Sequence, residues 1–177
     1  MKNINIATLV FFLMLAHPAF AFDGQRQGFV LGLGLGGGIV QPQQGAGGKE
    51  SVSSLLMSGS LSYGFNDSFQ LGLGKKVASF KYNNGKVYQE LGGIVADIFF
   101  DQYYLTLGTG ISGAVNKVSL DNYLVGKSSF IGLGYELTPG LNIEYVLGNA
   151  TFDTAGSSVV TPERETFFGV LLTTFIY

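Results

Sequence analysis

The chain has 177 residues, the length of one domain, and 46% of them are hydrophobic while only 12% are charged. It contains no cysteine, so no disulfide stabilises it, and its formal net charge of −2 provides no basic surface for nucleic acid. Since no apolar run of membrane-spanning length follows the N-terminal region, the hydrophobic residues are spread over many short segments.

The N-terminus has the features of a secretory signal peptide. Lys2 is the only charged residue before Asp23, a mostly apolar stretch covers 4–16, and Ala19-Phe20-Ala21 matches a cleavage site. The apolar stretch is shorter than the roughly 20 residues of a comfortable spanning helix. We therefore predict a signal peptide over 1–21, cleaved after Ala21, followed by one domain over 22–177.

The absence of histidine from the mature chain limits its chemistry. His17 is the only histidine, and it lies in the predicted signal peptide. The mature protein therefore cannot build a Ser-His-Asp triad, a histidine general base or a zinc site of histidine and cysteine. We expect no enzymatic activity, no cofactor and no metal site.

Eight segments alternate between apolar side chains and small or polar ones. A period of two places the apolar side chains on one face of a β-strand, so each segment predicts a strand. In chain order the segments are 29–35, 55–65, 69–73, 88–100, 103–115, 131–137, 141–147 and 167–177.

The first segment contains glycines that also match a phosphate-binding pattern, G-x-G-x-x-G, at Gly32, Gly34 and Gly37. A dinucleotide-binding loop needs a helix after the glycines, whereas the polar, glycine-rich stretch 41–48 follows here. The pattern instead favours a strand with leucines on one face and glycines on the other, where the glycines leave room inside a narrow barrel.

The third segment leaves two alternatives open. After Leu73 the apolar residues change from odd to even positions, at Ala78 and Phe80. A β-bulge near Lys75 and Lys76 would explain the change. Without a bulge, Lys75 lies on the apolar face and must extend its ammonium group toward water.

The connections alternate between short and long. Short turns are expected at 66–68, 101–102 and 138–140 because turn-forming residues fill them. Their lengths agree with the assigned faces, since residues paired across an antiparallel hairpin point the same way. An Asn-Gly hairpin turn is expected within 83–86. The longer connections are 41–50, 116–122 and 149–165.

The polar faces carry mostly Gly, Ser and Thr, which makes a poor soluble surface. They suit the interior of an eight-stranded barrel, which is just wide enough for side chains to fill it. The apolar faces then contact lipid, and strands near ten residues match the roughly 9–11 that cross a bilayer. We predict an all-β, eight-stranded, antiparallel up-and-down transmembrane barrel. The alternation of faces along the strands predicts that a polar network in the lumen contains Lys76, Asp97, Glu136 and Glu144. Lys76 belongs to this network only if no bulge interrupts its strand.

Aromatic residues gather near both ends of the strands, as expected for two belts at the membrane interfaces. Those at the short-turn ends are Tyr63, Phe65, Phe69, Phe99, Phe100 and Tyr103, and those toward the long connections are Tyr82, Tyr88, Tyr123 and Phe167.

The signal peptide, the eight alternating strands and the ending GVLLTTFIY resemble the small eight-stranded outer-membrane barrels, the opacity-type and outer-membrane-protein-A-like group. In that family a terminal aromatic residue is part of the signal read by the barrel assembly machinery, which implies this role for Tyr177 together with Phe175. The resemblance implies a Gram-negative outer membrane as the location, with outer-membrane lipid and the assembly machinery as partners.

The expected function is a structural or surface-contact role, in which loops 41–50 and 149–165 face outward toward a host or environmental ligand. A narrow pore, or a passage for small apolar ligands, is one alternative. A soluble, secreted, lipocalin-like barrel with apolar residues inside is the other.

Overall fold

The computed structural model of the protein describes residues 26–43, 51–82, 85–116, 123–152 and 164–177. The predicted signal peptide and its cleavage site lie outside these ranges. Within them, no helix is long and apolar enough to cross a membrane. The strands are β1 (Gly28–Gln43), β2 (Val52–Asn66), β3 (Phe69–Tyr82), β4 (Gly85–Phe100), β5 (Tyr103–Asn116), β6 (Tyr123–Thr138), β7 (Leu141–Phe152) and β8 (Arg164–Ile176).

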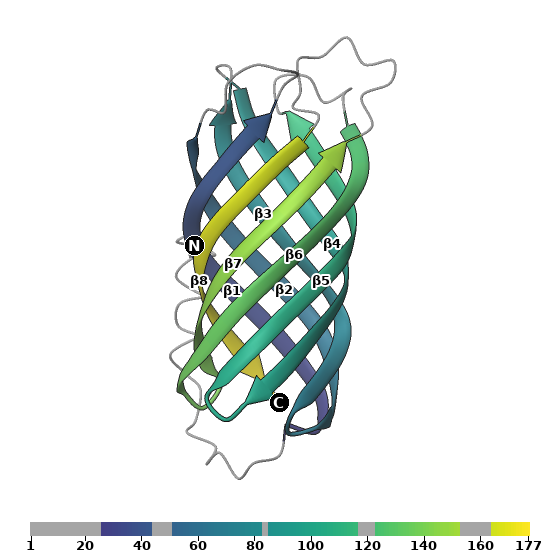
Figure 1. Cartoon of the computed structure of the whole chain (residues 1–177), viewed down its shortest axis with the longest axis vertical. Helices are drawn as coiled ribbons and strands as arrows, with labels where there is room; N and C mark the ends of the chain where they lie inside the picture. The colour runs from purple at the N-terminus through teal and green to yellow at the C-terminus, as the bar shows by residue number, and fades with distance from the viewer. Residues whose placement is uncertain (1–25, 44–50, 83–84, 117–122, 153–163) are drawn as a thin grey trace, which may run out of the picture.

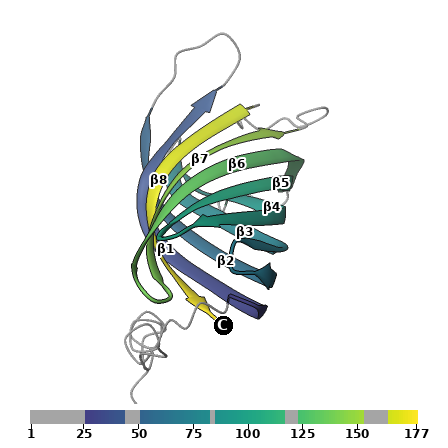
Figure 2. The same cartoon turned by 60° about the horizontal axis from the view of Figure 1, so that its bottom comes forward.

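These strands form the predicted closed, antiparallel, up-and-down barrel (Figure 1). Each strand pairs with the next along the chain, and β1 also pairs with β8, from Leu31 opposite Ile176 to Gln43 opposite Arg164. The tilted strands run around a single wall, as Figure 2 shows from the end that carries the short turns and the C-terminus. The closed order leaves no strand edge unpaired, which is what a barrel needs in lipid.

At two of the short turns, one strand contains an extra residue that shifts the pairing register, while the apolar side chains keep their predicted outer face. At the β2–β3 turn, Gly64 pairs with Gln70 and Asn66 with Phe69, so the register shifts around Phe65. At the β6–β7 turn, the predicted three-residue turn 138–140 would place Leu137 opposite Leu141. Thr138 pairs with Leu141 instead, so the register shifts there as well. Both shifts keep the apolar side chains outside. The remaining short turn pairs Phe100 with Tyr103 across two residues, as predicted.

The register of β3 decides between the two alternatives for the lysines. Its pairing with β4 continues without a shift from Phe69 to Tyr82, so no bulge separates Lys75 from Lys76. Lys75 points outward and forms an ion pair of 2.7 Å with Glu90, while Lys76 points into the lumen. The change of apolar parity has another cause: Ala78 and Phe80 are buried inside the barrel.

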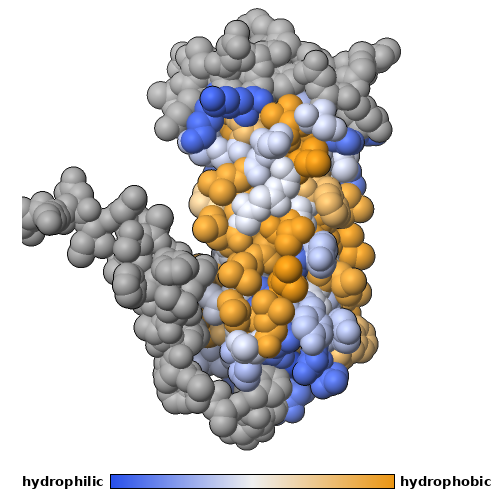
Figure 3. All heavy atoms as spheres, turned by 90° about the vertical axis from the view of Figure 1, so that its left-hand side faces the viewer, coloured by the Kyte–Doolittle hydropathy of each residue, from blue (hydrophilic) through white to orange (hydrophobic). Residues whose placement is uncertain are grey.

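The outer wall is apolar, as the alternation predicts. Mid-strand residues such as Leu73, Leu107 and Leu133 are 67%, 42% and 57% exposed in the isolated chain. On one face of the barrel, Figure 3 shows a hydrophobic band between more hydrophilic ends. The band has the position and composition of a lipid-facing surface.

Two residues assigned to the outer aromatic belts lie inside instead. Phe99 and Phe167 are 5% and 2% exposed and face the lumen, whereas the next residues in sequence, Phe100 and Phe168, face outward. The prediction assigned them to the belts because they lie near strand ends. Successive residues of a strand point to opposite faces, so odd or even position along the strand decides which aromatic ring faces outward.

The strands also extend further than the sequence predicts at the long-connection end. β1 continues to Gln43 and β7 to Phe152, and β8 starts at Arg164. Backbone pairing explains the extension, because Gln41 still pairs with Thr166 beyond the predicted end of β1. The central parts of loops 41–50, 116–122 and 149–165 lie outside the described residues.

Candidate functional site

The lumen is the candidate functional site, and its polar centre is built around a buried ion pair. Lys76 of β3 and Glu144 of β7 lie four strands apart in the order of the barrel, on opposite walls. The Lys76 ammonium nitrogen donates to both Glu144 carboxylate oxygens, at 2.9 and 3.1 Å. The side chains are only 11% and 4% exposed, so each charge depends on its partner.

Neighbouring residues complete this centre. The Lys76 ammonium lies 5.0 Å from the centroid of the Phe130 ring, which adds a cation–π contact. Asp97 accepts a 2.6 Å hydrogen bond from the Thr106 hydroxyl, its direct partner across β4 and β5. Lys76, Asp97 and Glu144 line one cavity of about 30 Å³, which is room for about one water molecule.

Glycines on the inner wall make this packing possible. A Cβ atom at Gly132 would collide with a carboxylate oxygen of Glu144, and one at Gly108 would overlap the Phe130 ring. Phe130 is the direct cross-strand partner of Gly108. Gly132 and Gly108 therefore do more than leave a roomy interior, since the first accommodates the Glu144 carboxylate and the second the Phe130 ring.

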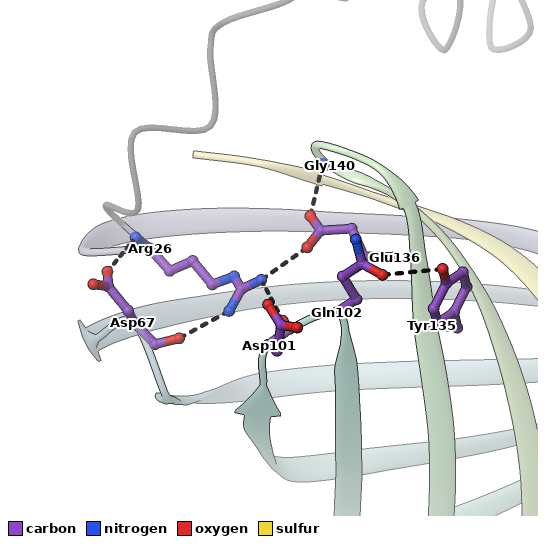
Figure 4. A network of polar contacts seen from close by, with 7 residues as sticks. All are labelled: Arg26, Asp67, Asp101, Gln102, Tyr135, Glu136 and Gly140. Atoms are coloured by element: carbon purple, nitrogen blue, oxygen red, sulfur yellow. Dashed lines mark hydrogen bonds and ion pairs between the residues drawn. The ribbon is translucent and has the colours of Figure 1, made fainter.

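A second polar cluster closes the end of the barrel that carries the short turns (Figure 4). The Arg26 guanidinium donates to the Asp67 carbonyl at 3.0 Å, to the Asp101 carbonyl at 3.2 Å and to Glu136 Oε2 at 2.8 Å. The Arg26 backbone N–H donates to Asp67 Oδ1, and Glu136 Oε1 accepts from the Gly140 N–H. One buried arginine thus joins the three short turns.

Arg26 was not among the residues that the sequence singled out. It precedes the first alternating segment, so no periodicity applied to it. The available signal was that Arg26 is the only basic residue between the predicted cleavage site and the first strand. The guanidinium also lies 4.3 Å from the centroid of the inward-facing Phe99 ring.

The four residues of the predicted lumen network therefore fall into two groups. Lys76, Asp97 and Glu144 share the central cavity, whereas Glu136 lies at the end of the barrel with Arg26. The structure gives each of the two glutamates its own cation, Arg26 for Glu136 and Lys76 for Glu144.

The half of the lumen toward the long connections is mostly apolar, with Gln89 and Glu165 buried among the apolar residues, and the sequence did not predict this. The pattern suggested an interior of Gly, Ser and Thr throughout. Inward-facing residues there form a buried hydrophobic core: Val40, Leu56, Ala78, Phe80, Val87, Leu91, Val95, Ala114, Phe130, Val146, Ala150, Phe152, Phe167 and Leu171. The described lumen thus has an apolar layer, a charged layer at its centre and the arginine cluster at the short-turn end.

The two residues of the predicted assembly signal lie at the end of β8. The Phe175 ring is buried and packs against Tyr104 and Phe99, with centroid distances of 5.6 and 6.2 Å. Tyr177 follows the strand and is 45% exposed. Near the end of β8, the side chains that point outward toward lipid include those of Leu172 and Ile176. Whether Phe175 and Tyr177 act as an assembly signal stays a prediction.

A closed wall, an apolar exterior and a charged, filled interior define a small eight-stranded barrel of the outer-membrane type. Comparison with solved structures gives the same class. The chain is similar to Neisserial surface protein A, with a TM-score of 0.54, 13% identity, and 84% of this chain and 97% of that chain covered. It is also similar to Ail, the attachment invasion locus protein of Yersinia pestis, with a TM-score of 0.57, 10% identity and coverage of 84% and 98%.

At these identities the similarity establishes the fold alone. A comparison with protein-family models found no match, and a comparison with curated proteins found none either. What the barrel does must therefore be argued from its own residues.

Proposed function

We propose that the protein is a Gram-negative outer-membrane barrel without enzymatic activity, in which the barrel supports surface-exposed loops. The observation that carries the proposal is the apolar wall around a closed barrel. Strands of 12 to 16 residues exceed the roughly 9–11 needed to cross a bilayer, so their ends extend into water. The short turns then face the periplasm and the long connections face outward.

The alternative of a soluble, lipocalin-like barrel has less support. Such a barrel places apolar residues inside and polar residues outside. Here Leu73, Ile94 and Ile111, all on the outer face, are 67%, 57% and 65% exposed. A continuous apolar surface of this kind would drive a soluble protein to aggregate.

The alternative of a pore or transport barrel is also weakened by the packing of the lumen. The Lys76–Glu144 pair bridges its centre, and the apolar core fills the half beyond it. Ions would have to separate a buried ion pair and then pass an apolar layer. We therefore propose a barrel that carries no steady current, in which these charged residues are structural.

The arrangement of the three carboxylates predicted to lie in the lumen supports the absence of catalysis. Glu144 and Glu136 are held by cations, and Asp97 is held by Thr106. Each is engaged within the barrel wall rather than presented to a substrate-sized cleft.

A surface-contact role for loops 41–50 and 149–165 is the finer part of the proposal. The two similar structures are a surface protein and an attachment invasion locus protein, names that describe those proteins. By analogy, these two proteins support a contact with a host or environmental ligand through the loops of this chain.

Cell fractionation and planar-bilayer recording test the proposal. The protein should be recovered with outer membranes, migrate differently on a gel when unheated than when boiled, and show a mass consistent with cleavage after Ala21. Purified protein should give no reproducible channel steps. Recovery from the soluble periplasm would refute the barrel proposal. Channel steps altered by Glu144→Gln would favour the pore.

A further inference from the structure

One ion pair lies on the outer wall of the barrel. Lys75, near the middle of β3, points outward, and its ammonium nitrogen lies 2.7 Å from a carboxylate oxygen of Glu90 on β4. The other two ion pairs of the described residues have buried side chains. Exposed apolar side chains lie next to Lys75 on its own strand and on both neighbouring strands: Leu73, Met57, Leu61 and Ile94. The backbone of Lys75 therefore lies within the apolar band.

The two charged groups have further bonding capacity on this wall. An ammonium has three N–H donors and a carboxylate has two acceptor oxygens, whereas the ion pair joins Lys75 to one oxygen of Glu90. The two side chains are 53% and 34% exposed, and within the described residues neither forms a second ion pair. Lipid chains provide no donors or acceptors, so this wall favours an additional polar partner.

Glycines beside the pair allow another wall to come close. Gly59 and Gly92 are the direct partners of Lys75 on β2 and β4. A Cβ atom at Gly59 would have no atom within 4 Å, and the nearest atom to one at Gly92 would be 3.7 Å away. Small residues let backbones approach each other where proteins associate within lipid. The wall on both sides of Lys75 is therefore shallow enough for close contact.

We infer that a second copy of this chain covers this wall in a twofold-symmetric dimer, in which Lys75 of each copy pairs with Glu90 of the other. The inference rests on the proposed membrane location. Apolar walls gain nothing from leaving lipid, because lipid chains are as apolar as leucine, so packing and polar contacts decide where proteins associate. A twofold contact needs a self-complementary surface, which one positive and one negative charge side by side provide.

The geometry of the pair suits this symmetry. Two copies inserted in the same direction are related by an axis along the membrane normal, so their twofold contacts join groups of equal height. Glu90 lies two residues along β4 from Gly92, the partner of Lys75, yet the charged ends of the pair are 2.7 Å apart and so lie at nearly the same height. Rotation about an axis beside them forms a ring of four alternating charges. A different protein would need the reversed charges at that height, whereas a second copy has them by symmetry.

The first test uses the absence of cysteine from the chain, since one introduced cysteine then reports one position. Gly92→Cys lies beside the pair. The matched control is Leu147→Cys, which is also exposed on the outer wall but lies on β7, across the barrel from β3. In outer membranes, a short bis-maleimide should join Gly92→Cys copies into a covalent dimer and leave Leu147→Cys monomeric. Dilution of the protein in lipid should reduce the dimer by mass action and leave the ion pair within each single barrel in place.

Charge reversal separates contacts between copies from contacts within one copy. Lys75→Glu and Glu90→Lys, each added to Gly92→Cys, should lower the dimer yield by about tenfold or more, because like charges then face each other. Co-expressed with tags of different size, the two variants should form the mixed dimer at close to the parent yield, although the pair within each barrel stays broken. Lys75→Gln and Glu90→Gln, which change the wall less, should also lower the yield but should not rescue each other. A gel shift on heating verifies that each variant is folded.

Three results would overturn the inference. A barrel that stays monomeric at every protein-to-lipid ratio has no such interface. Equal cross-linking through Gly92→Cys and Leu147→Cys would show random collision. Folded charge-reversal variants that do not form the mixed dimer would show that the charges do not meet between copies. Any of these results from a protein that fractionates with outer membranes would refute this inference alone and leave the proposed function standing.

Discussion

The ion pair at the centre of the lumen should be a main determinant of barrel stability. Lys76→Met removes the ammonium from two buried carboxylates, Glu144 and Asp97, that line the same cavity. Unit charges about 3 Å apart attract by about 5–6 kcal/mol at an effective dielectric constant of about 20. Desolvation of the pair offsets part of this attraction, and breaking a buried pair from one side costs about 3–5 kcal/mol. We expect Lys76→Met to lower the free energy of unfolding by that amount.

Its neighbour provides the matched control. Lys75 is on the same strand and also forms an ion pair, but its side chain is 53% exposed on the outer wall. An exposed pair contributes about 0–1 kcal/mol, so Lys75→Met should change the free energy of unfolding by no more than that. The double variant Lys76→Met/Glu144→Gln removes both buried charges of the pair and should lie within about 2 kcal/mol of the wild type.

Denaturant titration of the barrel in phospholipid vesicles would measure these differences. The chain has no tryptophan, so the folded fraction is best followed by circular dichroism and by the mobility of unheated samples on gels. Equal losses for Lys76→Met and Lys75→Met would show that the lumen is hydrated enough to screen the charge. Strictly additive effects in the double variant would show that Lys76 and Glu144 do not depend on each other.

Three further changes test the arginine cluster, the lipid face and an inner glycine, and a fourth tests the chain end. Arg26→Ala should lower the free energy of unfolding by about 3 kcal/mol, because it leaves a buried carboxylate without its cation, and the same titration measures this loss. Leu133→Arg should cost about 2–4 kcal/mol in lipid and Leu133→Ser much less; the absence of any cost would mean that the faces are inverted. Gly134→Ala should cost about 1–3 kcal/mol because its methyl group would overlap a buried tyrosine ring, whereas Gly59→Ala, on the open outer wall, should not destabilise the barrel. Deleting Tyr177 should reduce the yield of membrane-inserted barrel in cells, and a normal yield would show that the terminal aromatic residue is dispensable.

The sequence alone was sufficient for the fold. A period of two identifies strands and their apolar face without any knowledge of neighbours. Turn length gave the correct register at the β4–β5 turn, whereas the β2–β3 and β6–β7 turns shift the register by one residue. The pairing of Phe100 with Tyr103 and the outward position of Leu107 and Leu133 follow from such local rules.

The partners of the inner residues needed the tertiary structure. Parity states that Lys76, Glu136 and Glu144 face inward, but it does not state at which height of the barrel each one lies. Height depends on the tilt and stagger of the strands around the closed wall, which no single strand encodes. That stagger brings Lys76 to Glu144, 68 residues away, and Arg26 to Glu136, 110 residues away.

The same reason explains why the apolar half of the lumen went unnoticed. In the sequence, Ala78 and Phe80 suggest that the apolar residues have changed faces within one strand, because alternation normally separates an apolar face from a polar one. Only the closed barrel shows that several strands place apolar residues inward at the same height, where they pack against one another as a core. The faces of this protein were set by its local sequence pattern, and the contents of its lumen by the closure of eight strands around a narrow axis.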